Sequence, residues 1–491
     1  MSSNDKEHDL EQQQLKREIK GWQISFIALG GVVGSVYFLG VALIINDMGP
    51  AVVIAYGIVG FILFGIMIAF AELIVNLPRR GAFIAYAHEF LGEPIAAGIG
   101  WSYWLAWGAF IPSEAIAGGF ILNSFIEGPV MLYAGIILGL VTIINLAEVK
   151  FFARIESGLA ITKVGVIVIF IIAAIGIWLG IWGTGDGFIG TKVLLDDTNA
   201  NIFDNLFPGG IVAIFVGMTL IFSTVGGVEI VGMTAAEAEE PEKSVPKACR
   251  SIVYRVCLVY IIPVILIVLL FPTEEAGIDG SIFALVLSTY GLNKIAWIFT
   301  FVVIVAAFSC SNTAFYATAR DMYGLAQSGL APKIFKKVNK NQSPRNSVYV
   351  STIYIWLIFI FAVFAGESTA YMYLITATGF AGAICWIGII ASQLRFRYLL
   401  KKRGYDVKSA VKSRIKIMAV PIAALILLLA GLGYLAAGLG SFGMFVIAIL
   451  AFAVPFAIFV FKRTVLHSKT ELEIPNDEEF FNDKYPPKKK I

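Results

Sequence analysis

Long apolar runs dominate this chain, and short polar segments separate them. Most runs have about 20 residues or more, the length that an α-helix needs to cross a bilayer. The pattern predicts an all-α polytopic membrane protein with about twelve spanning helices, at residues 22–46, 51–76, 94–125, 129–147, 155–182, 208–235, 251–271, 284–324, 347–366, 370–394, 417–437 and 440–462. Two runs, 94–125 and 284–324, are longer than a bilayer requires, so we expect tilt or an extra interfacial helix there.

The first predicted span is interrupted at its centre. Residues 30–35 read G-G-V-V-G-S, which places Gly30, Gly31, Gly34 and Ser35 in the middle of an apolar run. Backbone that leaves a helix inside a membrane is tolerated only where protein or a water-filled cavity satisfies its polar groups. This segment is therefore predicted to line a binding site at mid-membrane depth.

The sixth predicted span carries a second interruption, at Gly226 and Gly227, with Glu229 two residues further on. Five spans separate the two glycine pairs, and an odd repeat of five inverts the topology of the second half. Interrupted helices at corresponding positions of two halves indicate the site of a transporter. Glycine also serves close helix packing in membranes, but two pairs at matching positions, each beside a polar residue, favour the site.

The two interruptions predict opposite polarities. The outer half of span one is expected to start near Gly34 and Ser35, where unpaired amides favour an anion. Its inner half is expected to end at residues 31–33, and the outer half of span six at residues 223–226, and both ends leave free carbonyl groups. Amides for a carboxylate and carbonyls for an ammonium suit the zwitterion of an α-amino acid.

Ionisable residues inside the apolar runs are the next candidates, because a charge at mid-membrane is costly. Lys163 lies about nine residues into its span, roughly 13 Å along the helix. It either snorkels to the interface or is a desolvated amine that loads and releases a proton, and its depth favours the second interpretation. Glu114 and Glu229 are each a structural acceptor or a coupling carboxylate, with the structural role favoured for Glu229. Glu156 is expected at the interface.

Composition agrees with a membrane protein. The chain has 491 residues, of which 58% are hydrophobic and 14% are charged, and its mean hydropathy is +0.83; a soluble domain has roughly 25% charged residues. Basic clusters precede the first span and follow every even-numbered span up to the tenth, which predicts cytoplasmic termini. The polar start of the chain predicts no cleaved secretory signal. The spacing of the four cysteines predicts neither a zinc site nor a disulfide framework.

Four segments in order resemble one transporter family. They are G-G-V-V-G-S at 30–35, V-G-G-V-E-I-V-G-M-T-A-A-E-A-E-E-P-E-K-S-V-P-K-A at 225–248, S-C-S-N-T-A-F-Y-A-T-A-R-D-M-Y-G-L-A at 309–326 and C-W-I-G-I-I-A-S-Q-L-R-F-R at 385–397. Together they resemble the amino acid–polyamine–organocation superfamily, and within it the amino acid permease branch. The resemblance extends from about residue 18 to about residue 400.

The resemblance implies an inverted five-plus-five core of the LeuT type with helices 1 and 6 broken. The expected organisation is an N-terminal tail at 1–21, a transport core at 22–400, peripheral helices at 401–463 and a C-terminal tail at 464–491. It also implies substrate contacts, with a carboxylate near Gly34 and Ser35 and an ammonium near Val32, Ser223 and Gly226. The complete set of expected substrate-binding residues is Gly31, Val32, Gly34, Ser35, Val36, Glu114, Phe222, Ser223, Gly226 and Gly227.

Coupling and specificity follow from the same resemblance. Some members hold a lysine in place of a sodium ion at the position of Lys163, which favours proton coupling, with Glu229 as the second coupling candidate. The chain departs from the family pattern at Val36, where glycine is usual and which bulky Tyr37 follows, and this leaves the exact carboxylate contacts open. It departs again at Ser223, where an aromatic gate is common, so room or a hydroxyl is expected for a polar substrate side chain.

The expected function is secondary active transport of amino acids across the cytoplasmic membrane, by proton-coupled symport and alternating access. The alternatives are an exchanger of amino acids or polyamines, and an amino acid sensor built like a transporter. An enzyme is disfavoured because none of the three histidines lies deep in a span. The expected partners are a small amino acid and the lipid bilayer, without nucleic acid or a cofactor other than the proton, and the oligomeric state is open.

Overall fold

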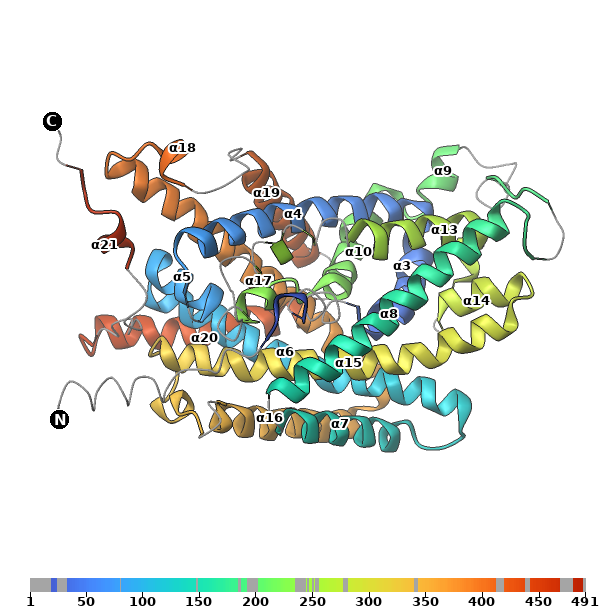
Figure 1. The fold of residues 1–491 in the computed structure, drawn as a ribbon, viewed down its shortest axis with the longest axis horizontal. Helices are drawn as coiled ribbons and strands as arrows, with labels where there is room; N and C mark the ends of the chain where they lie inside the picture. The colour runs from blue at the N-terminus through green and yellow to red at the C-terminus, as the bar shows by residue number, and fades with distance from the viewer. Residues whose placement is uncertain are drawn as a thin grey trace.

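The structure is a computed structural model, helical throughout its regular parts (Figure 1). It describes residues 19–23, 33–79, 81–146, 149–183, 187–191, 202–234, 244, 247–249, 251, 256–276, 281–339, 343–411, 419–437, 442–468 and 480–488. Two of the predicted site residues, Gly31 and Val32, lie outside these ranges. The elements in chain order are η1 (Val36–Gly40), α3 (Val41–Met48), η2 (Gly49–Ala51), α4 (Val52–Asn76), α5 (Ala82–Leu91), α6 (Glu93–Phe125), α7 (Val130–Leu146), α8 (Val149–Trp178), α9 (Ile202–Leu206), α10 (Gly210–Val225), α11 (Ile230–Thr234), η5 (Cys257–Ile261), α13 (Ile262–Leu270), η6 (Thr273–Glu275), α14 (Ile282–Thr289), α15 (Asn293–Gln327), η7 (Lys333–Lys336), α16 (Arg345–Ala365), α17 (Glu367–Lys402), α18 (Val407–Ala410), α19 (Ala419–Ala437), α20 (Phe442–Thr464) and α21 (Phe481–Lys484).

Among the described residues, eight helical stretches are long and apolar enough to cross a membrane, and three shorter apolar helices accompany them. The predicted spans from 51–76 onwards each coincide with helical structure, although several ends are displaced. Of the first predicted span, the structure describes the second half, η1 and α3, which leads through η2 into α4. The chain is thus an all-helical integral membrane protein.

The two long apolar runs, 94–125 and 284–324, have different structures. Residues 93–125 form one helix, α6, with Pro112 inside it. The run at 284–324 divides into the short helix α14 and the long helix α15, at a turn where Gly291 has φ +79°. An extra helix was one of the two expectations for these long runs, and α14 is such a helix. Helix α5, which follows the second span, was not predicted.

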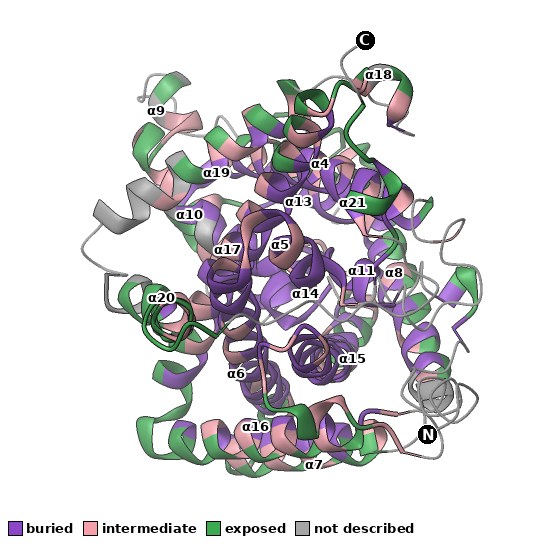
Figure 2. Cartoon of the chain, turned by 90° about the vertical axis from the view of Figure 1, so that its left-hand side faces the viewer, coloured by how far each residue is buried: buried purple, intermediate pink, exposed green. Residues whose placement is uncertain are grey.

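Helices α6, α15 and α17 form the centre of the molecule, and α6 packs along both of the others. Figure 2 shows these helices buried, with α7, α16 and α20 at the periphery and partly exposed. The exposed side chains are largely apolar, such as Phe364 and Ile143, which are 84% and 67% exposed. An apolar outer surface of this extent suits contact with lipid.

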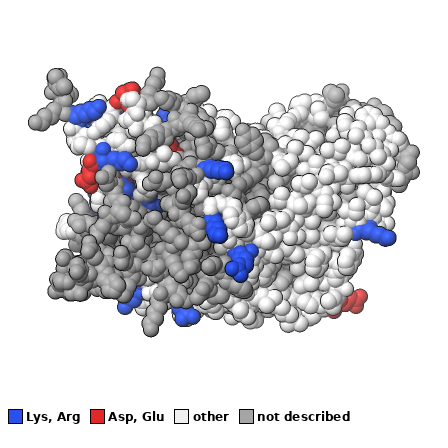
Figure 3. Space-filling view, viewed as in Figure 1, with Lys and Arg blue, Asp and Glu red and all other residues white. Residues whose placement is uncertain are grey.

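Charged side chains gather at one end of the bundle. Figure 3 shows Lys and Arg mainly over the left half of the view, where α5, α18 and α21 lie, while most of the right half is uncharged. We call this the α5–α21 end. Partly buried ion pairs occur at this end, including Arg79 with Glu89 at 2.9 Å and Arg397 with Glu72. These two salt bridges link the ends of α4, α5 and α17.

The C-terminal segment 480–488 docks onto the same end. Phe481 is only 3% exposed and lies under the guanidinium of Arg403, which is 4.3 Å from its ring centre. Its backbone amide donates to Glu89 of α5 at 2.8 Å. The ammonium of Lys484 donates to the carbonyl oxygen of Asn76, the last residue of α4, at 2.6 Å. The segment therefore links α4, α5 and the end of α17.

Candidate functional site

The second half of the first span begins near Ser35, where the sequence predicted a half-helix to start. Ser35 is the residue before η1, a turn of π-helix that continues directly into α3, while Val33 and Gly34 are not helical. The amide groups at such a helix start have no partner within the helix. The start of this half-helix therefore presents backbone amides that have no partner within the helix.

A carboxylate of the protein itself occupies the amide side. The backbone amide of Ser35 donates to Oε2 of Glu114 at 2.8 Å, and Glu114 lies on α6, fully buried, two residues after Pro112. A Cβ on Gly34 would lie 2.6 Å from Oε1 of Glu114 and 2.8 Å from Sγ of Cys310. Glycine is therefore required here because the carboxylate and α15 approach the backbone closely.

An amine of the protein occupies the carbonyl side. Nζ of Lys163, on α8, donates to the carbonyl oxygen of Val33 at 3.0 Å, and the side chain is fully buried. The snorkelling alternative for Lys163 is thus wrong. The Glu114 carboxylate accepts from the Ser35 amide, and the Lys163 amine donates to the Val33 carbonyl. These two contacts have the polarity that the sequence predicted for this interruption.

The second interruption also lies where it was predicted. Helix α10 ends at Val225, residues 226–229 form turns, and α11 begins at Ile230. Gly227 has φ +100°, a conformation that residues with a side chain rarely adopt. The carbonyl of Thr224 in the last turn of α10 accepts a hydrogen bond from the hydroxyl of Tyr260 at 3.0 Å. Tyr260 of η5 thereby caps one of the free carbonyls.

Glu229 is held by hydrogen bonds on both oxygens. The hydroxyl of Tyr103 on α6 donates to Oε1 at 2.9 Å, and Nε1 of Trp386 on α17 donates to Oε2 at 3.0 Å. The carboxylate thus fastens α6 and α17 to the start of α11, as the structural interpretation expects. A coupling role for Glu229 stays a prediction.

The predicted specificity residues of span six face α17. The hydroxyl of Ser223 donates to the carbonyl of Ile375 at 2.9 Å. The ring of Phe222 meets Trp386 edge-on, with ring centres 5.6 Å apart. The Ser223 hydroxyl is thereby engaged by the backbone of α17 in this structure.

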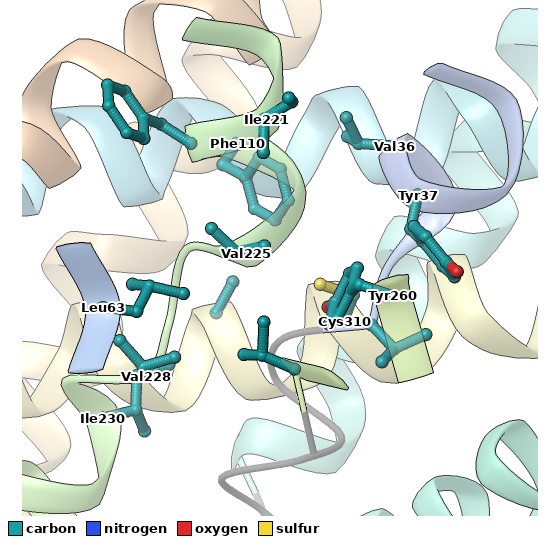
Figure 4. Close-up of a cluster of buried hydrophobic side chains, with 14 of the residues drawn as sticks. Val36, Tyr37, Leu63, Phe110, Ile221, Val225, Val228, Ile230, Tyr260 and Cys310 are labelled. Atoms are coloured by element: carbon teal, nitrogen blue, oxygen red, sulfur yellow. The ribbon is translucent and has the colours of Figure 1, made fainter. Parts of the chain in front are cut away.

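The residues that depart from the family pattern in span one also have clear contacts. The hydroxyl of Tyr37 donates to the carbonyl of Val259 at 2.6 Å, and its ring centre lies 4.5 Å from that of Tyr260 (Figure 4). Tyr37 therefore joins the outer half of span one to η5. Val36 is buried beside it, 1% exposed.

Four polar atoms around the interruptions lack a hydrogen-bond partner among the described residues. They are Oγ of Ser35, Oε1 of Glu114, Nε1 of Trp107 and the hydroxyl of Tyr371. Tyr371, on α17, interacts electrostatically with Glu114 and with the Ser35 side chain. The Trp107 ring lies 3.9 Å from where a Cβ of Gly226 would be. Buried polar groups are almost always paired, so this set can receive a polar ligand.

The sequence missed part of this arrangement. Glu156, expected at the interface, is fully buried because α15 covers it: Oγ of Ser309 donates to its Oε1 at 2.5 Å and Nδ2 of Asn312 to its Oε2 at 3.3 Å. The run S-C-S-N at 309–312, polar inside an apolar span, was the available signal. Tyr371 and Tyr260 were also missed, and no pattern distinguishes them from other membrane tyrosines. The described residues contain no cluster of three His, Cys, Asp or Glu side chains that could hold a metal ion.

Comparisons with known proteins identify the family of the chain. The family model described as "Amino acid permease" matches residues 23–470. The chain is 34% identical over 395 residues to the aromatic amino acid transport protein AroP of Escherichia coli K12, covering 80% of this chain and 84% of that protein. It is 32% identical over 420 residues to a putative histidine permease of Bacillus subtilis 168 (84% and 87%), and 29% over 403 residues to the lysine-specific permease LysP of E. coli K12 (80% and 81%). The chain belongs to the amino acid permease family of the amino acid–polyamine–organocation superfamily.

Proposed function

We propose that this permease takes up amino acids across the cytoplasmic membrane by proton-coupled symport with alternating access. The observation that carries the proposal is the first-span interruption, where a carboxylate meets an amide and an amine meets a carbonyl. The names of the relatives, which refer to lysine, histidine and aromatic amino acids, support an amino acid as the cargo.

The substrate carboxylate is proposed to replace Glu114 at the amide of Ser35. Two carboxylates repel each other at one site unless one of them is protonated or turned away. The buried hydroxyls of Ser35 and Tyr371 then become donors for the incoming carboxylate. The substrate ammonium is placed on the carbonyls near Val32, Ser223 and Gly226, as the zwitterion requires.

Proton coupling is assigned to Lys163. As an ammonium it donates a charge-assisted hydrogen bond to Val33, and such bonds are roughly twice as strong as neutral ones. When the ammonium gives its proton to water and becomes an amine, its hydrogen bond to Val33 weakens. Release of the proton and release of the backbone at Val33 are thereby linked.

The proposed architecture is an inverted five-plus-five core with both termini in the cytoplasm. The concentration of Lys and Arg at the α5–α21 end supports this orientation through the positive-inside rule. Fusions to the C-terminus test the orientation. A fluorescent protein fused there is expected to fold and fluoresce in intact cells, and an alkaline phosphatase fusion to be inactive. An active phosphatase would reverse the assignment.

The central test uses purified protein in proteoliposomes with an imposed pH gradient. Wild type should accumulate a radiolabelled substrate found by a thermal-shift screen of all amino acids and common polyamines. Lys163→Ala should lose gradient-driven accumulation and keep counterflow exchange. Normal accumulation by Lys163→Ala would refute proton coupling at this residue. Exchange by wild type without any response to the gradient would favour an exchanger, and substrate binding without flux would favour a sensor.

A further inference from the structure

We propose that residues 480–488 form a latch that holds helix α5 in place and thereby keeps the α5–α21 end of the permease closed. The surface that receives the latch is built from α4, α5 and the end of α17, and its occupant is this segment of the same chain. The proposal needs the alternating access of the proposed function but no coupling ion, so it does not depend on Lys163.

Helix α5 is a short helix with a glycine at each end. Gly81, directly before it, has φ +95°, and Gly92, directly after it, has φ +100°. Glycine adopts such angles without strain. Hinges are commonly a few residues at the ends of an element that absorb a change in backbone angles. The ten residues of α5 are therefore able to turn as one unit between these two glycines.

One side of α5 packs against the second interruption. Helix α5 contacts α11, the second half of span six. The ring of Tyr86 meets Phe70 of α4 edge-on, with ring centres 6.3 Å apart, and Phe70 lies against Gly232 of α11. The ring of Phe83 lies 4.8 Å from that of Tyr103, the residue that donates to the carboxylate directly before α11. A movement of α11 therefore requires α5 to move as well.

The latch binds α5 at the opposite end of that helix. Oε1 of Glu89 accepts a hydrogen bond from the backbone amide of Phe481 at 2.8 Å, and the same carboxylate accepts two bonds from Arg79, at 2.9 and 3.0 Å. The ring of Phe481 lies 5.6 Å from that of Phe90 on α5 and 5.7 Å from that of Phe396 on α17. Phe481 thereby joins α5 to α17.

Arg403, the residue after α17, holds the latch at several points. Its Nη1 donates to the carbonyl of Tyr485 at 2.6 Å, and its guanidinium covers the ring of Phe481. Its own carbonyl accepts from the backbone amide of Lys488 at 3.1 Å. The bond from Lys484 to the end of α4 adds a third helix. Because the latch is tethered to the bundle, its effective concentration at this surface is high, and the surface is occupied most of the time.

The test is hydrogen–deuterium exchange of the α5 amides, at 82–91, in full-length Phe481→Ala. Loss of this buried ring should weaken the latch by at least about tenfold. Amide exchange follows local opening, so α5 should exchange faster by about the same factor. The initial rate of counterflow in proteoliposomes should also rise above that of wild type, because the closed form of this end is then less favoured.

Three further variants separate the latch from a general effect on stability. Phe481→Leu keeps apolar bulk and should restore most of the protection of α5. Arg403→Ala removes the opposite side of the same contact and should act in the same direction as Phe481→Ala. Tyr398→Ala is the matched control, because it removes an aromatic ring near the end of α17 that is 54% exposed, and it should leave exchange and counterflow unchanged.

The outcomes decide each step. Faster exchange in α5 with wild-type exchange in α7 supports the latch, whereas equal acceleration in both helices shows a general loss of stability and overturns it. Unchanged exchange in α5 also overturns it. Faster exchange without faster counterflow overturns its role in closing this end. If Phe481→Ala does not fold, Arg403→Ala decides by the same measurements. Absence of flux in wild type would refute transport itself, and α5 exchange would still show whether the segment holds the helix.

Discussion

A methyl group added to Gly34 would collide with the carboxylate that occupies the first-span interruption. In Gly34→Ala the new Cβ would lie 2.6 Å from Oε1 of Glu114, whereas ordinary contacts begin at 3.4 Å. The carboxylate must therefore retreat by 3.4 − 2.6 = 0.8 Å. If Oε2 moves equally far, its distance from the Ser35 amide grows from 2.8 Å to about 3.6 Å, which is no longer a hydrogen bond.

The lost interaction is a hydrogen bond between a buried amide and a carboxylate. Such bonds to charged groups contribute about 1.5–3 kcal/mol, and each 1.36 kcal/mol is a factor of ten. The same methyl group would also press on Sγ of Cys310 at 2.8 Å, so the inner face of α15 must shift as well. The substrate carboxylate is proposed to bind the same amide, so the methyl group would cost it the same hydrogen bond. We therefore expect transport by Gly34→Ala to fall by roughly 10- to 150-fold.

The assay is initial uptake rate in proteoliposomes, normalised to the amount of folded protein found by size-exclusion chromatography. Gly165→Ala is the matched control, because it is a glycine of a spanning helix, α8, whose added Cβ meets nothing within 4 Å. It should transport at close to the wild-type rate. Equal rates for Gly34→Ala and Gly165→Ala would refute the inference that close approach of Glu114 to the backbone matters for transport.

Three further changes probe other parts of the structure. Ser223→Phe loses the hydrogen bond to Ile375 and fills the space beside it, so the set of amino acids that compete for uptake should change; an identical competition profile would contradict this. Gly227→Ala forces a side chain onto φ +100° and should lower the free energy of unfolding by about 1–3 kcal/mol relative to Gly139→Ala, whose Cβ meets nothing, as read from thermal unfolding in detergent. Phe481→Ala removes a buried ring and should speed tryptic cleavage within residues 480–488; unchanged cleavage would show that the ring does not hold the segment.

The interruptions were predictable from sequence because their causes are local. Glycine pairs inside apolar runs mark where a helix can end, and the direction of each span fixes which backbone groups become free. The structure accordingly starts η1 after Ser35 and ends α10 at Val225. The depth of Lys163 also follows from counting residues, and its burial is confirmed.

The remaining features depend on contacts between distant segments, which a single sequence does not reveal. Glu156 was assigned to the interface because it lies outside Lys163 in sequence, but α15, about 150 residues later, covers it. Tyr371 has no local signature, and only the fold brings it beside Glu114. The bond between Phe481 and Glu89 joins residues almost 400 positions apart. Tertiary packing, not local pattern, sets these positions.

The bond between Glu114 and the Ser35 amide has a consequence for affinity. A side chain that rests where a substrate carboxylate would bind is a tethered competitor, present at a fixed and high effective concentration. In the proposed mechanism every substrate molecule displaces it, so the apparent dissociation constant would be the intrinsic constant divided by the fraction of time that the amide is vacant. With a bond of about 1.5–3 kcal/mol, that factor is roughly 10 to 150. In the same mechanism Glu114 would also speed substrate release, because its carboxylate can bind the amide again as soon as the substrate carboxylate dissociates.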